Sequence, residues 1–192
     1  MPEDELSAYK SAAAVVAPGL AALVWLEATL SGSFETAWGG LDPVFRLAVV
    51  QEWISSNAEV LELVEVDRDD LARQLASAAP THWLWHACGC RAVRRTVERL
   101  VEGQRGVRYG IGTRPRFVAP DLEVVVVFDL DGLPVDDRGR HVLPVGEGRQ
   151  TYPLIMRLLE GRHVVRGVGM GLLQPGWPPP MKRSCAPRTD RS

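Results

Sequence analysis

Residues 121–130 read Asp-Leu-Glu-Val-Val-Val-Val-Phe-Asp-Leu, and this stretch decides the fold. Its alternating pattern predicts a β-strand over Leu122–Leu130, with successive side chains on opposite faces. Further along, Leu154–Leu159 and Val164–Val168 flank Glu160-Gly161, a sequence typical of a hairpin turn. The chain before residue 107 is mainly helical in pattern. The sequence therefore predicts an α+β fold in which N-terminal helices pack on the concave face of a curved antiparallel sheet.

Size and charge limit the classes of protein to which this chain can belong. Its 192 residues have the length of one domain, and 46% hydrophobic and 24% charged residues are typical of a globular protein. A net charge of −2 excludes a broadly basic nucleic-acid-binding protein, so we expect no nucleic-acid partner. The cysteines, Cys88, Cys90 and Cys185, are too few for a disulfide framework and indicate a reducing compartment. Arginine far outnumbers lysine, which is typical of a GC-rich bacterial genome.

The N-terminal part of the chain contains a nearly uncharged stretch, Ala12–Leu26. It follows an acidic start, residues 2–5, where a secretory signal would be basic, and it is too short to span a bilayer before Glu27. We therefore expect a cytoplasmic protein without a membrane segment. The predicted organisation is an N-terminal extension over residues 1–17, a folded domain over residues 18–174, and a Pro-rich, basic and disordered tail over residues 175–192.

Helix start and stop signals predict the elements that cover the sheet. They are a short helix within residues 3–16, helices over Pro18–Leu30, Phe34–Trp38 and Pro43–Ser55, a helix capped by Asp67 or Asp69 and ended by Pro80, and a long helix over residues 81–101. Asp42 is the expected cap of the helix Pro43–Ser55, which is apolar nearly all round and should be buried. The apolar face of Pro18–Leu30 is predicted to contain Leu20, Leu23, Val24 and Leu30. The long helix should place Val93, Val97, Leu100 and Val101 on one side and Arg91, Arg94, Arg95, Glu98 and Arg99 on the other.

Potential metal ligands also occur in the long helix. His82, His86 and Cys90 recur every four residues, so a regular helix would place them together on its buried side. The spacing His-x3-His-x3-Cys can present zinc ligands, and Cys88 adds a second thiol. No further ligand is evident, Gly89 weakens the helix, and buried histidines and small thiols are commoner than metal sites. We therefore expect no metal and no other cofactor.

Two segments of the chain resemble a known family. Trp25-Leu-Glu-Ala-Thr-Leu-Ser-Gly-Ser-Phe-Glu-Thr-Ala-Trp-Gly-Gly-Leu-Asp-Pro-Val-Phe-Arg46 resembles the opening of nuclear transport factor 2-like domains, in the cystatin-like α+β superfamily. Met156-Arg-Leu-Leu-Glu-Gly-Arg-His-Val-Val-Arg-Gly167 is similar to the last two strands of that family, with His163 where tryptophan is common. The resemblance implies a cone in which helices close over a curved sheet. Family members include dehydratases, isomerases, epoxide hydrolases and polyketide cyclases, together with pockets of no known chemistry, so the fold does not settle the function.

Strand register predicts which residues face the helices. A two-residue turn at Glu160-Gly161 pairs Arg157 with Val164 and Ile155 with Arg166, and places His163 on the face opposite Arg157. Because apolar faces must meet the helices, the residues expected inside are Leu122, Val124, Val126, Phe128, Leu154 and Met156. The charged residues expected on the outer face are Glu123, Asp129, Arg157 and Arg166, where cross-strand ion pairs or a dimer surface are commoner than catalysis.

The candidates for lining a pocket in the cone are His86, Tyr109, His163, Met156, Phe128 and Trp25. Two functions remain open. The first is an apolar cavity that binds a small hydrophobic ligand or a protein partner without catalysis, in a homodimer formed through the outer sheet face. The second is a small-molecule lyase, isomerase or hydrolase in which His86, Tyr109 or His163 transfers protons. A third possibility is an accessory domain that docks through its Pro-rich end and basic tail.

Overall fold

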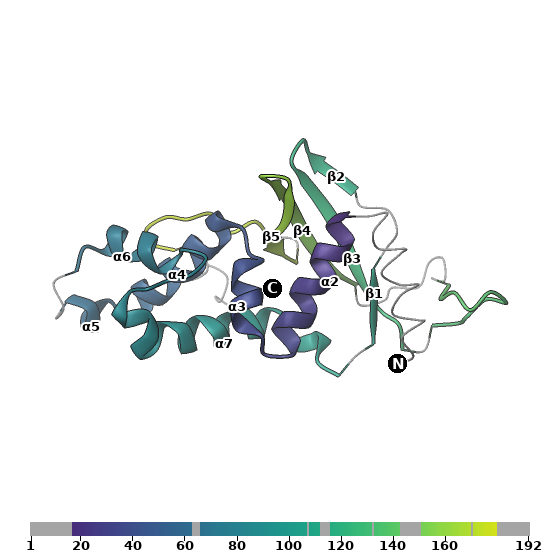
Figure 1. Cartoon of the computed structure of the whole chain (residues 1–192), viewed down its shortest axis with the longest axis horizontal. Helices are drawn as coiled ribbons and strands as arrows, with labels where there is room; N and C mark the ends of the chain where they lie inside the picture. Colours follow the sequence, from purple (N-terminus) through teal and green to yellow (C-terminus); the bar gives the residue numbers. More distant parts are fainter. Residues whose placement is uncertain are drawn as a thin grey trace, which may run out of the picture. The chain divides into compact units, whose positions relative to one another are not determined.

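The structure is a computed structural model that describes residues 17–62, 66–106, 108–111, 116–131, 133–142, 151–169 and 171–179. It confirms the α+β class, with helices and a five-stranded antiparallel sheet (Figure 1). The chain forms two compact units. The sheet unit comprises the residues up to Leu41 and Val97–Leu172, and the helical unit comprises Asp42–Thr96 and the residues from Leu173 onward. The helix expected within residues 3–16 and the tail beyond residue 179 lie outside the described residues.

The sheet has the strand order β1-β3-β4-β5, with β2 also paired to β3. The strands are β1 (Tyr109–Ile111), β2 (Arg116–Ala119), β3 (Leu122–Asp129), β4 (Thr151–Leu159) and β5 (Arg162–Val168). β1 pairs with the C-terminal end of β3 and β2 pairs with its N-terminal end, so the two short strands share one edge of the sheet.

The β4–β5 hairpin turns at Glu160-Gly161, as predicted. Glu160 and Gly161 have φ angles of 50° and 78°, which are the positive values of a tight two-residue hairpin turn. Arg157 pairs with Val164, which confirms the predicted register next to the turn.

A β-bulge in β5 changes the surroundings of Arg166. The register shifts between Ile155 and Met156, so Ile155 pairs with Gly167 and not, as predicted, with Arg166. Arg166 is 6% exposed, and the prediction that it lies on a solvated outer face is therefore wrong. Alternation could not reveal this, because one inserted residue exchanges the faces of all residues beyond it.

The two faces of β3 differ in what covers them. The covered face, which meets the helices, holds Val125, Val127, Leu154, Met156 and Val165, each at most 1% exposed. The open face holds Leu122, Val124, Val126 and Phe128, which are all half-buried. The prediction that these last four residues meet the helices is wrong. The run Val124–Val127 has no alternation of its own, so it does not distinguish the two faces.

Helix α2 (Ala17–Leu30) packs on the covered face (Figure 1). Its buried residues are Pro18, Gly19, Ala22, Trp25, Leu26, Ala28 and Thr29. Leu20 and Val24, which were expected to be on the buried side, are 36% and 49% exposed. The helix is apolar nearly all round, and periodicity therefore does not fix which side is buried.

Helix α3 (Phe34–Gly39) continues the cover and leads the chain to the sheet. The rings of Phe34 and Trp38 stack with their centroids 5.8 Å apart. Immediately after α3, the carbonyl of Gly40 accepts a 2.9 Å hydrogen bond from the backbone N–H of Val165, and Leu41 forms a parallel bridge with the same residue. The segment that follows α3 therefore pairs with the outer edge of β5.

The helical unit contains α4 (Pro43–Ser56), α5 (Ala58–Glu62) and α6 (Arg68–Leu75). Asp42 caps α4 as predicted, because its carboxylate accepts a 2.7 Å hydrogen bond from the backbone N–H two residues on. Asp67, and not Asp69, caps α6. Within this unit the buried Arg46 of α4 donates from Nε to the carbonyl of Ala76 at 2.8 Å, which ties α4 to the end of α6.

A π-helical turn, Trp85–Gly89, interrupts the helix predicted over residues 81–101. Helix α7 (Cys90–Leu100) follows it. Because a π-turn spans five residues, the buried row steps from Leu84 to Gly89 and only then continues at four-residue intervals through Val93, Val97 and Val101. The predicted division of α7 is confirmed, since Arg91, Arg94, Arg95 and Arg99 are exposed on its other side.

Candidate functional site

His163 of β5 and Glu123 of β3 approach each other on the covered face. Nε2 of His163 lies 3.8 Å from Oε1 of Glu123, and the two side chains are 13% and 17% exposed. β4 runs between the two strands, so the backbones are roughly 10 Å apart and the side chains must reach across. His163 is on the face predicted for it. The prediction that Glu123 lies on the outer face is wrong, because its register partner Met156 is fully buried.

A carboxylate beside an imidazole is an arrangement that can support proton transfer. At 3.8 Å the contact is longer than a hydrogen bond, and it becomes an ion pair when His163 is protonated. The imidazole could accept a proton from a bound molecule while Glu123 orients the ring and stabilises the imidazolium. Alternation does not indicate this pairing, since it predicts a different face for each of the two residues.

Tyr109 cannot join this pair. It lies in β1 opposite Asp129, at the far end of β3 from Glu123. The two positions are six residues apart on β3, which corresponds to roughly 20 Å of strand. Asp129 shares the face of Val127, so its predicted outer placement is also wrong. Tyr109 and His163 therefore cannot act on one small molecule.

The apolar candidates are distributed over both faces of the sheet. Trp25 and Met156 are 1% and 0% exposed and belong to the core on the covered face. The indole N–H of Trp25 is buried and has no hydrogen-bond acceptor among the described residues. Phe128 lies on the open face, so these three side chains do not line a common pocket.

His82, His86 and Cys90 do not converge on a metal. The π-turn, Trp85–Gly89, has a five-residue repeat, so a four-residue spacing no longer places these side chains on one side of the helix. His86 is exposed and does not lie on the buried side. Nδ1 of His82 accepts a 3.2 Å hydrogen bond from the backbone N–H of Leu84. Within the part of the chain that the structure describes, no group of three histidine, cysteine, aspartate or glutamate side chains could hold a metal ion.

Tyr152 is a half-buried polar residue that no motif in the sequence singled out. It lies in β4 opposite Val127, and its hydroxyl donates to the carbonyl of Leu100 at the end of α7. Burial raises the pKa of the Tyr152 phenol well above its ordinary value of 10.0. The phenol therefore keeps its proton at neutral pH and serves as a structural donor. Its alternation with Leu154 and Met156 was the signal that could have placed it inside.

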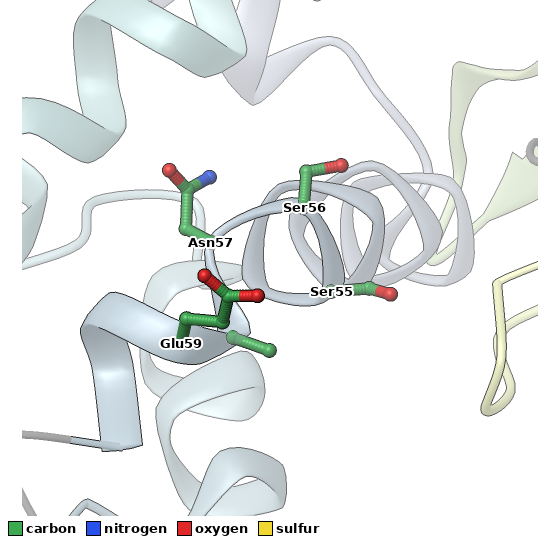
Figure 2. Close-up of a pocket in the computed structure, with 5 residues that line it drawn as sticks. Ser55, Ser56, Asn57 and Glu59 are labelled. Atoms are coloured by element: carbon green, nitrogen blue, oxygen red, sulfur yellow. The ribbon is translucent and has the colours of Figure 1, made fainter.

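A polar hollow of about 300 Å³ lies where α4 ends and α5 begins (Figure 2). It is lined by Ser55, Ser56, Asn57, Ala58 and Glu59. Nδ2 of Asn57 donates to the carbonyl of Trp53 at 2.7 Å and so covers one carbonyl of the last helical turn. None of the predicted pocket residues lies here, and the small polar lining does not suit a hydrophobic ligand.

The fold and the Glu123–His163 pair together define an α+β protein whose antiparallel sheet is covered by helices on one face and carries an acid–base pair there. Comparison with protein-family models, curated proteins and solved structures finds no match for this chain. Among the described residues, no helix combines the length and the apolar composition that crossing a membrane requires.

Proposed function

We propose that this chain is a bacterial, cytoplasmic nuclear transport factor 2-like domain that binds a partner without catalysis and forms a homodimer through the open face of its sheet. The observation that carries the proposal is the open face itself. Leu122, Val124, Val126 and Phe128 form an apolar row on β3 that α2 does not cover. These side chains are half-buried, and a contiguous apolar row that stays partly accessible is characteristic of an interaction surface.

The covered face supports a protein partner over a small ligand inside the cone. Its apolar side chains Val125, Val127, Leu154, Met156 and Val165, together with Trp25 and Leu26 of α2, are each at most 1% exposed. Residues at this burial pack against one another as a core. A partner would therefore bind at another surface, and the partly exposed apolar row on β3 is the surface that we propose.

A second copy of the chain is the occupant proposed for the open face. One end of the face carries both signs of charge, because Nε of Arg157 lies 2.8 Å from Oδ2 of Asp121. A two-fold interface places the same patch on both sides, and a patch with paired charges at its end can meet its own copy without like-charge repulsion.

Light scattering after size-exclusion chromatography tests this proposal. The wild type should elute as a dimer at tens of micromolar, and Val126→Glu should be monomeric because a carboxylate would be buried in the interface. Val24→Glu is the matched control, since Val24 is an exposed valine on α2, 49% exposed and outside the open face. A monomeric wild type, or a Val126→Glu variant that remains dimeric with an unchanged melting temperature, would refute the homodimer.

The Glu123–His163 pair favours a second function, a lyase, isomerase or hydrolase that uses this pair for proton transfer. A positioned acid or base contributes roughly 10²- to 10⁴-fold to a rate. Any turnover found in a screen of ester, epoxide and β-hydroxy-carbonyl substrates should fall by at least 100-fold in His163→Asn. Arg162→Gln is the control, because Arg162 is an exposed neighbour on the same strand. Equal activity in His163→Asn and Arg162→Gln would show that the Glu123–His163 pair takes no part in the reaction.

A further inference from the structure

The chain returns from the sheet to the helical unit in an extended segment, Leu173–Pro179, which we call the strap. The backbone N–H of Gly176 donates to Oε1 of Gln51 at 2.8 Å, and Nε1 of Trp177 donates to Oδ1 of Asp69 at 2.7 Å. The guanidinium carbon of Arg68 lies 4.8 Å from the centroid of the Trp177 ring. The strap is therefore bound through a backbone group, an indole N–H and an aromatic face.

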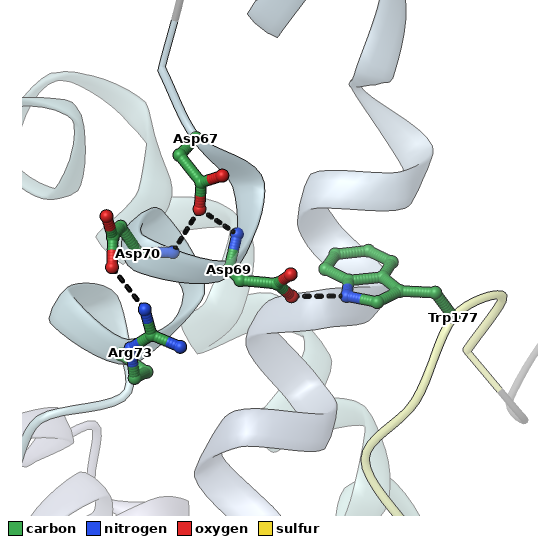
Figure 3. A network of polar contacts seen from close by, with 5 residues as sticks. All are labelled: Asp67, Asp69, Asp70, Arg73 and Trp177. Atoms are coloured by element: carbon green, nitrogen blue, oxygen red, sulfur yellow. Dashed lines mark hydrogen bonds and ion pairs between the residues drawn. The ribbon is translucent and has the colours of Figure 1, made fainter.

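The helix side of this contact is held in place by its own interactions (Figure 3). Asp67 accepts hydrogen bonds from the backbone N–H groups of Asp69 and Asp70 at 2.9 and 2.8 Å, which fixes the first turn of α6. The side chain of Asp70 points away from the strap and pairs with Arg73. Asp69 points toward the indole of Trp177. Consecutive aspartates thus have different partners, and one of them is directed at the strap.

Gln51 supplies the most buried part of the contact. It is 6% exposed with the strap in place, and its side-chain oxygen accepts the hydrogen bond from the backbone N–H of Gly176. A buried acceptor is stabilised by a donor, so this position favours a bound N–H. Asp69 adds a charge-assisted hydrogen bond and Arg68 adds a cation–π contact, both of which select for tryptophan.

The strap has the composition of a recognised peptide. Pro175, Pro178 and Pro179 flank Gly176-Trp177, and their rings fix backbone φ angles, which lowers the entropy lost on binding. The contacts of the strap with the helical unit are made by side chains of α4 and α6. This is the arrangement of a peptide ligand and its receptor joined in one chain.

We propose that Gln51, Arg68 and Asp69 form a peptide-recognition site that the strap occupies in cis, and that a proline-flanked Gly-Trp segment of another polypeptide competes for it. This proposal does not depend on the open face of the sheet. A short tether holds a ligand at an effective concentration in the millimolar range, so the strap excludes weak external ligands until it is displaced.

The test uses a dye-labelled peptide with the sequence Leu173–Pro179 and fluorescence anisotropy on the full chain. Trp177→Ala vacates the indole position, and the peptide should bind this variant at least tenfold more tightly than the wild type. Adding Asp69→Ala should abolish this gain, whereas adding Asp70→Ala should retain it, because Asp70 pairs with Arg73 and not with the indole. Circular dichroism melts of all the variants establish that each is folded.

A second peptide, with alanine in place of its tryptophan, should not bind any variant. The proposal is overturned if the labelled peptide shows no saturable binding to Trp177→Ala up to 1 mM (about tenfold above a 100 µM dissociation constant). Equal binding to the wild type and to Trp177→Ala would show that the strap does not occupy the site. Equal losses from the Asp69 and Asp70 substitutions would show that the effect is structural.

Discussion

The two faces of β3 carry similar side chains in different surroundings. Val125 and Val127 are each 1% exposed under α2, whereas Val124 and Val126, their immediate neighbours, are half-buried. Charged residues do not separate the faces either, because Glu123 is on the covered face together with the valines that α2 buries. The two faces differ in whether α2 covers them.

This difference shows where chemistry can occur in the sheet. The acid–base pair on the covered face, Glu123 and His163, is largely removed from water, so its interaction is screened less than that of a surface pair. On the open face, the apolar side chains of β3 are not covered by α2, so this face suits association with another surface. The same strand thus supports a proton-transfer candidate on one side and a binding candidate on the other.

The largest expected effect is a difference in the stability lost when a side chain is truncated on one face or the other. Met156→Ala on the covered face should lower the free energy of unfolding by about 3 kcal/mol, because the site is fully buried and a cavity remains. Phe128→Ala on the open face removes a larger side chain but should cost less than half as much, since Phe128 is half-buried. Chemical denaturation of both variants measures the difference. Equal losses would mean that the open face is also covered.

An intermediate effect concerns the end of the covered face. Tyr152→Phe should cost about 1–2 kcal/mol, because the carbonyl of Leu100 loses its donor. Burial raises the folded-state pKa of Tyr152, so its contribution is complete below pH 10 and is lost as the pH rises above the ordinary value of 10.0.

Two measurements check this. Ultraviolet titration should show a phenol that ionises well above pH 10.0 in the wild type and is absent in Tyr152→Phe. Above pH 10, the free energy of unfolding of Tyr152→Phe should also fall less steeply with pH than that of the wild type. A phenol that ionises at its ordinary pH in the folded protein would contradict the burial of Tyr152.

The smallest effect is expected at the charged end of the open face. The side chains of Arg157 and Asp121 are 33% and 47% exposed, so their coupling in a double-mutant cycle should be below about 1 kcal/mol. It should decrease further in 1 M salt, where the screening length is about 3 Å. A larger, salt-independent coupling would indicate that this end is covered in solution, as a dimer through the open face requires.

Local signals were sufficient for several elements. The Glu160-Gly161 turn, the Asp42 cap and the arginine side of α7 each depend on residues within one turn of structure, and the structure confirms all three. The proposed sites could not be found this way. Glu123 and His163 are separated by two strand pairings, and the contact between Trp177 and Asp69 joins residues 108 positions apart.

The sequence by itself determined the α+β class, the hairpin and the helix caps, because alternation, turn residues and capping residues act over a few positions. The tertiary structure decided which face of Val124–Val127 is buried, which side of α2 meets the sheet, and where the bulge at Arg166 and the π-turn at Trp85–Gly89 change the register. Each of these depends on which surfaces meet. An apolar run in a strand, or a helix that is apolar all round, can bury either of its sides. Only contact with the rest of the chain selects the side that is buried.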